Sequence, residues 1–392
     1  MSTLLPPEIW MQIIRWATLP PTDLGVTQAY LPFRVPYDTT DDSSIEWKRN
    51  MIHVCRLWRA LATPMLYEDI RVIHSAHRLA QIMEDTRDVD HGGYGQWVRR
   101  LVLPYASTET PTLDGNVSSI LGILRCCQGL ECLIRPISKV IPGTLRYEFS
   151  VGMVPLLSLK RLEWWHYNDA ARSGGINSLV DVLENTPNLQ HLAVGGNWRM
   201  SSERILELAQ LTTLRLRRID PPFVRMICRW KLPALTHVIA DFAIVNVAVG
   251  GFWETFGHRL TTLELGRTIT FLLETDQIAQ YLRACPNLTT LNYAIHFTQA
   301  PRITHPHNLR CIGVYAAACP MLDSMEEWAR WNHLNGHLNF ISSPLLPDFR
   351  TLVFYGSWQA TSHDIRFANS CRLILPERIS VIMDVEDQEH SA

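Results

Sequence analysis

The fold of this chain is decided by Leu260-Thr-Thr-Leu263-Glu-Leu265 and, 28 residues later, by Leu288-Thr-Thr-Leu291-Asn-Tyr293. Both stretches follow the pattern apolar-x-x-apolar-x-apolar. The last two apolar positions lie two residues apart, so in a strand they would point to the same side. The pattern, complete or shortened, recurs at residues 98–103, 130–133, 159–164, 189–194, 211–216, 235–238, 260–265, 288–293, 309–314 and 349–354.

These copies start 21 to 32 residues apart, except for a last step of 40. The period resembles that of leucine-rich repeats, and Thr186-Pro-Asn-Leu189 and Cys285-Pro-Asn-Leu288 are similar to the junctions of such repeats. Residues 176–184 and 276–283 have helical spacing between expected strands. The resemblance covers roughly residues 95 to 356. It implies an α/β fold, an irregular solenoid with a curved parallel sheet and outer helices.

The N-terminal 70 residues predict a separate helical module. Pro6 and Pro7 suit the start of a helix, because proline has no amide hydrogen to leave unpaired there. Ile9, Ile13 and Ala17 then share one helix face. A second helix is predicted from about Ser44 until Pro64, where the missing amide would end it.

Two blocks of this module resemble the two ends of an F-box, a short three-helix domain. Leu5, Pro6 and Glu8 match its opening Leu-Pro-x-Glu, and a later Val-x-x-x-Trp-x-x-Leu is followed by an apolar–aromatic tail. Residues 19–46 depart from the family, because a loop replaces its usual turn and second helix. The resemblance implies that a Skp-family adaptor, and through it a cullin, would bind Leu5, Pro6, Glu8, Ile9, Ile13, Val54, Trp58, Leu61 and Leu66.

The strand alternation predicts a second surface. Residues between the inward apolar positions would line the open sheet face, and aromatic, Arg and carboxylate groups there suit protein recognition. The mixed charge argues against nucleic acid, which needs a mainly positive surface. A bare solvated face without a ligand is the alternative. The expected target-binding residues are Arg161, Glu163, Trp165, His191, Arg215, Arg217, His237, Asp241, Glu264, Asn292, Tyr315 and Tyr355.

The expected domain organisation has four parts. Residues 1–70 form the F-box-like domain with its inserted loop at about 19–46, and 71–95 form a linker. The repeat solenoid spans 96–375, and 376–392 form an acidic tail that begins with a short strand.

Two functions follow as alternatives. The first is the substrate-recognition subunit of a cullin–RING (SCF-type) ubiquitin ligase, in which the F-box binds the adaptor and the repeats bind a target protein. The second is an interaction scaffold outside any ligase, whose N-terminal helices only cap the solenoid.

Other functions have little support in the sequence. His91-Gly-Gly-Tyr-Gly95 could suggest an oxyanion loop, but no G-x-S-x-G nucleophile follows, so we expect no enzyme. His305 and His307 have no partner ligands at metal-site spacing, so we expect no metal and no cofactor. The most apolar window, 234–253, holds charged and polar residues, so we expect no membrane span. Nine irregularly spaced cysteines and the absence of a signal-peptide pattern favour the cytoplasm, the nucleus or both.

Overall fold

The computed structural model divides into two compact units. Unit 1 comprises Met1–Tyr30, Val35–Leu211 and Lys231–Pro233, and unit 2 comprises Leu31–Arg34, Thr212–Trp230 and Ala234–Ala392. Most of the insertion at 19–46 lies outside the described residues. So do His91 and the end of the acidic tail. The structure describes residues 5–18, 31–33, 44–72, 75–87, 93–103, 113–135, 154–166, 178–196, 205–241, 250–266, 277–295, 298–316, 327–356, 358 and 364–384.

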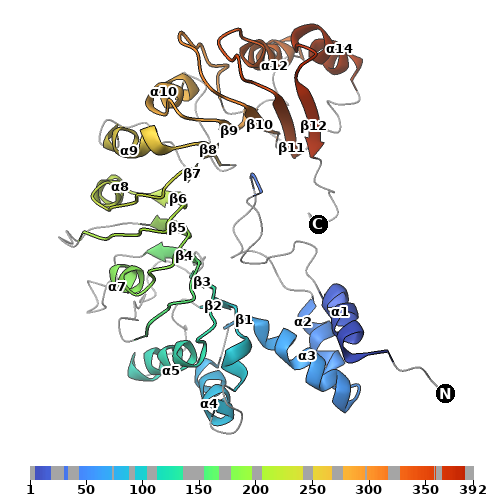
Figure 1. The fold of residues 1–392 in the computed structure, drawn as a ribbon, viewed down its shortest axis with the longest axis vertical. Coiled ribbons are helices and arrows are strands. Elements are labelled where there is room, and N and C mark those ends of the chain that lie inside the picture. Colours follow the sequence, from blue (N-terminus) through green and yellow to red (C-terminus); the bar gives the residue numbers. More distant parts are fainter. Residues whose placement is uncertain are drawn as a thin grey trace. The chain divides into compact units, whose positions relative to one another are not determined.

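Unit 1 carries a parallel sheet whose strands follow one another in chain order, with helices on one side (Figure 1). Each strand is parallel to the next, and the helices lie between them in sequence. The strands are β1 (Asp69–Arg71), β2 (Arg100–Val102), β3 (Cys132–Arg135), β4 (Arg161–His166) and β5 (His191–Gly196). Helices α4 (Ala76–Arg87), α5 (Leu113–Cys126) and α7 (Ser178–Glu184), with the 3-10 turn η2 (Tyr94–Trp97), belong to the same unit.

Unit 2 repeats this architecture. Its neighbouring strands are again parallel and in chain order. They are β6 (Thr213–Ile219), β7 (His237–Ala240), β8 (Thr262–Leu265), β9 (Thr290–Ala294), β10 (Cys311–Ala316), β11 (Thr351–Gly356) and β12 (Ser380–Asp384). The helices are α8 (Pro221–Ile227), α9 (Gly250–Phe256), α10 (Gln277–Ala284), α12 (Glu327–Ile341) and α14 (Ile365–Ile374), with the 3-10 turn η4 (Gly257–Arg259).

The repeat motif determines where each strand begins. In β8 and β9 the two quoted stretches pair in register, with Leu263 opposite Leu291. The first apolar residue of the motif, Leu260, lies two residues before its strand and is fully buried, and its N–H closes a turn onto the Gly257 carbonyl at 3.2 Å. The same two-residue offset holds for all ten predicted motifs. The α/β solenoid of leucine-rich-repeat type is therefore confirmed.

The Pro-Asn-Leu junctions tie successive repeats together. Asn188 donates its side-chain amide to the Leu157 carbonyl at 2.8 Å in unit 1. Asn287 donates in the same way to the His258 carbonyl at 2.7 Å in unit 2. Each asparagine thus satisfies a carbonyl of the preceding repeat, which the sheet alone would leave unpaired.

The N-terminal module contains three helices, α1 (Pro7–Thr18), α2 (Ser44–Met51) and α3 (Arg56–Glu68). The prediction of one helix from Ser44 to Pro64 was wrong. The helix breaks after Met51, and Cys55 caps α3 by accepting the Trp58 N–H at 3.4 Å. Pro64 lies inside α3, because Met65 beyond it packs with Ile14 and Ala62, and this tertiary contact overrides the proline penalty.

Helix α3 leads without a break into the sheet of unit 1. Glu68 ends the helix, and its carbonyl accepts the N–H of Arg99 at 2.9 Å. Tyr67 stacks on Tyr94 with ring centroids 4.5 Å apart. Of the expected linker 71–95, the described part contains the end of β1, helix α4 and the start of η2.

Candidate interaction surfaces

The helical module displays an apolar face to solvent. Ile9 and Ile13, which share one side of α1, are each 41% exposed, and Val54 between α2 and α3 is 60% exposed. Leu5 is exposed as well, as are Pro6 and Glu8. The residue of α1 that packs inward is instead Ile14, whose exposure is 1%. The side of the helix that the apolar spacing would place in a core is therefore open.

The remaining expected adaptor residues are half-buried. Trp58 contacts Trp10, with ring centroids 5.3 Å apart, so it helps to join α1 to α3. Leu61 packs against the small core of Ile14, Ala62 and Met65, and Leu66 is also half-buried. The nine residues thus divide into an exposed group and a half-buried group, and members of the half-buried group also pack within the helical module.

In unit 1 the open strand face is built from paired charges. Arg161 donates two hydrogen bonds to Glu163 Oε1, at 2.7 and 3.0 Å, and the glutamate is almost fully buried. On the opposite, core-facing side of the sheet, the guanidinium of Arg135 on β3 lies 4.9 Å from the ring centroid of Trp164 on β4, and both side chains are buried. Trp165 is buried too, and His191 is half-buried.

In unit 2 the same face holds a forked ion pair. Arg215 on β6 binds both carboxylate oxygens of Asp241, at 2.7 and 3.1 Å. Gly266 leaves room for this carboxylate, because a Cβ there would lie 2.0 Å from Asp241 Oδ1. His237 is buried nearby. Its burial, and secondarily the charge of Arg215, lowers the pKa of its imidazole to about 4. Arg217 is half-buried.

Further along unit 2, a residue from the N-terminal insertion occupies the strand face. Phe33 is 1% exposed and packs against Ala294 and Tyr315, with Tyr355 beside them. Its backbone N–H donates to Glu264 Oε2 at 3.1 Å. Burial above all raises the pKa of the Tyr355 phenol to about 12, so it stays neutral at physiological pH.

The twelve expected target-binding residues therefore share one property: none of them is exposed. The structure brings Arg161 to Glu163, Arg215 to Asp241, and Glu264, Tyr315 and Tyr355 to Phe33. Sequence reasoning missed Phe33 as part of this face. The apolar Leu31-Pro32-Phe33 within a polar loop was the one signal for Phe33. The buried members are Glu163, Trp165, His237, Asp241, Glu264, Asn292 and Tyr315, and the half-buried ones are Arg161, His191, Arg215, Arg217 and Tyr355.

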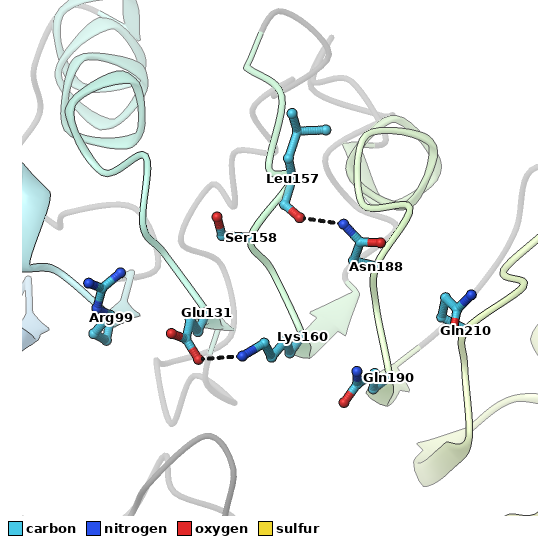
Figure 2. Close-up of a pocket in the computed structure, with 8 residues that line it drawn as sticks. All are labelled: Arg99, Glu131, Leu157, Ser158, Lys160, Asn188, Gln190 and Gln210. Carbon is cyan, nitrogen blue, oxygen red and sulfur yellow. Dashed lines mark hydrogen bonds and ion pairs between the residues drawn. The ribbon is translucent and has the colours of Figure 1, made fainter.

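Unit 1 has a hollow of about 340 Å³, lined by the residues that immediately precede strands β3, β4 and β5 (Figure 2). Its charged lining consists of Arg99, Glu131 and Lys160. Lys160 pairs with Glu131 at 3.0 Å, as Figure 2 shows. The rest of the lining is Leu157, Ser158, Asn188, Gln190 and Gln210, which supplies neither a strong base nor an activated nucleophile.

Reactive chemistry is equally scarce elsewhere in the described part of the chain. Burial raises the pKa of the Cys127, Cys132 and Cys285 thiols to about 12 each, so they remain protonated and unreactive. The described residues contain no group of three His, Cys, Asp or Glu side chains suited to a metal ion. His305 is exposed and His307 is half-buried. Among the same residues, no helix is both long and apolar enough to cross a bilayer.

The comparisons with known proteins find similarity among solved structures alone. No family model matches the sequence. No curated protein matches it either. Among solved structures, the chain is similar to the crystal structure of the leucine-rich repeat-containing protein LegL7 from Legionella pneumophila, with a TM-score of 0.36 and 12% identity, over 78% of this chain and 96% of that chain. The repeat architecture itself follows from the strands, helices and junctions described above.

Proposed function

We propose that this chain is a substrate-recognition subunit of a cullin–RING ubiquitin ligase, acting in the cytoplasm or nucleus. Its helical module would bind a Skp-family adaptor, and its repeats would bind a target protein. The chain would carry out no bond chemistry itself and would contribute by bringing the target close to the ligase. The supporting observation is the exposure of Leu5, Ile9, Ile13 and Val54, apolar residues from both blocks of the F-box pattern.

The energetics of this face fit a docking surface. Burying an aliphatic side chain of this size stabilises a complex by about 1.5 to 3 kcal/mol. Isolated apolar side chains on a surface need no explanation, but a group gathered on one small module commonly marks an interaction site. Glu8 at the start of α1 adds a charge beside this face, which would help to orient a partner.

The test is co-expression with a Skp-family adaptor, followed by size-exclusion chromatography. The wild-type chain should elute as a one-to-one complex. Replacing both Ile9 and Val54 by serine should reduce adaptor affinity at least about a hundredfold, because two buried aliphatic contacts are lost. Circular dichroism should not change, since both residues are exposed. Trp58 is a poorer choice, because its replacement would also remove the contact with Trp10.

A matched control is Ile205→Ser, which changes an equally exposed aliphatic residue outside the helical module. This variant should keep the complex. If the Ile9 and Val54 double variant also keeps it, the adaptor-binding assignment is wrong.

The second candidate function is the interaction scaffold, and one observation favours it. Because α3 continues into β1 and its end packs on η2, the module is joined to the first repeat of unit 1. Deleting residues 1–70 would remove Asp69 and Ile70 from β1, so that truncation would damage the sheet under either function. Exposed-residue variants separate the two functions instead. A wild-type chain that stays monomeric beside the adaptor would favour the scaffold.

A further inference from the structure

Phe33 occupies a formed pocket on the strand face of unit 2. Its ring stacks on Tyr315, with centroids 5.0 Å apart and planes 29° apart. The ring of Tyr355 lies at 5.4 Å and is tilted by 60°. The backbone N–H of Phe33 points to the carboxylate of Glu264, whose exposure is only 1%. A hydrogen bond to a buried carboxylate is stronger than one between neutral groups, so ring and amide are both recognised.

Two glycines make the room for this pocket. A Cβ on Gly313 of β10 would lie 2.8 Å from Tyr355 Cε2, and one on Gly356 of β11 would lie 2.6 Å from Tyr315 Cε2. Gly356 also has a φ of +85°, which side chains rarely adopt. Glycine inside a strand often marks the close approach of a ligand or another backbone. Because these glycines have no side chains, the rings of Tyr315 and Tyr355 have room to lie on the sheet beside the ring of Phe33.

The present occupant is not ideally suited to the pocket. Phe33 has a φ of 62°, in the left-handed region that is unfavourable for a bulky side chain. Leu31, two residues earlier, leaves its side chain 42% exposed. Backbone strain therefore offsets part of the free energy that Phe33 gains in the pocket. Strained residues of this kind are common at ligand-binding and switch positions. A peptide that presents an aromatic ring from a relaxed backbone would bind the same groups without that cost.

We propose that this pocket is the target-recognition site of the repeats, that it binds an aromatic residue of a linear peptide, and that Phe33 occupies it as an intramolecular competitor. This deepens the proposed function and depends on it only in that the repeats bind a protein. The preferred residue is aromatic because Tyr315 stacks on the ring and Tyr355 packs beside it at a tilt. Its main-chain amide must be free, so proline is excluded at that position. The Glu264 carboxylate disfavours an acidic residue there.

The experiment uses the full chain and a fluorescently labelled synthetic peptide with the sequence of residues 28–37. Phe33→Ala should empty the pocket and bind the peptide measurably by fluorescence anisotropy. The wild-type chain should bind it at least about tenfold more weakly, because a tethered competitor is present at roughly millimolar effective concentration. A peptide in which the phenylalanine is replaced by alanine should bind neither chain.

Two control variants locate the binding. Leu31→Ala changes an exposed neighbour and leaves Phe33 in place, so it should behave like wild type. Adding Tyr355→Ala to Phe33→Ala should remove peptide binding, because one ring of the pocket is lost. Equal affinity of wild type and Phe33→Ala for the peptide, or no binding to either, would overturn the proposal. Loss of the cooperative unfolding transition in Phe33→Ala would overturn it as well, since Phe33 would then be a core residue and not a replaceable occupant.

Adaptor binding is measured on the same preparations. It involves the helical module alone, so a Phe33→Ala chain that binds the adaptor but no peptide would reject only the pocket. A chain that binds the peptide but no adaptor would reject only the ligase function.

Discussion

In two regions the exposure is the reverse of what residue type suggests. The apolar face of α1 is open to solvent, and the polar strand face of unit 2 is buried. Ile13 is 41% exposed, whereas Glu264 is 1% exposed. Among the described residues, the packing around α1 covers the side of Ile14 and leaves the side of Ile13 open. In unit 2 a phenylalanine from a distant part of the sequence covers the glutamate. Exposure is thus decided by which segments are available to pack, and polarity alone does not predict it.

The largest effect should come from breaking the buried ion pair of the strand face. Arg215→Met would leave the Asp241 carboxylate buried without its forked partner, which should lower the free energy of unfolding by about 3 to 5 kcal/mol. Urea denaturation followed by circular dichroism would measure this loss. The control is Lys231→Met, whose ion pair with Glu207 is exposed and should contribute less than about 1 kcal/mol. Equal losses of unfolding free energy in both variants would show that burial does not determine how much an ion pair stabilises this protein.

The second effect is a pH dependence that arises from His237 on the same face. Its folded pKa is about 4 against 6.5 unfolded, so the unfolded state binds more protons between these values. Stability should be complete above about pH 6.5 and should fall by up to about 3 kcal/mol as the pH drops to 4. Urea midpoints at pH 7 and pH 5 would measure the fall. In His237→Gln the difference between the two midpoints should shrink, and an unchanged difference would contradict the assignment.

The third comparison uses two neighbouring residues of α1. Ile14→Ala should cost about 2 to 3 kcal/mol, because Ile14 packs with Ala62 and Met65 in the small core of the module. Ile13→Ala should change stability by less than about 0.5 kcal/mol, because its side chain faces solvent. Thermal unfolding of both variants would test this. A large cost for Ile13→Ala would mean that the open face is covered within the chain.

The smallest effect comes from filling the space at Gly313. An alanine there would place its Cβ 2.2 Å from Asn292 Oδ1, so Gly313→Ala should destabilise by about 1 to 2 kcal/mol and loosen Phe33. Gly251→Ala is the matched control, because a Cβ at that helical glycine meets nothing within 4 Å and should stabilise slightly. Denaturation midpoints that shift equally in both variants would contradict the picture of a tightly built pocket.

Local rules explain most of the fold that could be predicted. Each apolar-x-x-apolar-x-apolar motif gave a strand, and each strand began two residues into the motif. The helices expected at 176–184 and 276–283 are α7 and α10. These predictions succeeded because a repeat packs mainly on its sequence neighbours, so short-range periodicity carries the information. The prediction of one helix from Ser44 to Pro64 failed at two points. The chain breaks after Met51 and restarts at the Cys55 cap, and Met65 and Tyr67 hold it helical beyond the proline.

By itself, the sequence determined that the chain is a parallel-sheet repeat protein with a helical N-terminal module and which residues lie on each strand. Only the tertiary structure decided which of those residues can be reached. Phe33 and Glu264 are 231 positions apart, and no local pattern relates them. Their pairing depends on the shape of the pocket between two tyrosines and on the space that Gly313 and Gly356 leave. Long-range packing of this kind is a property of the folded chain, so it had to be seen in the structure.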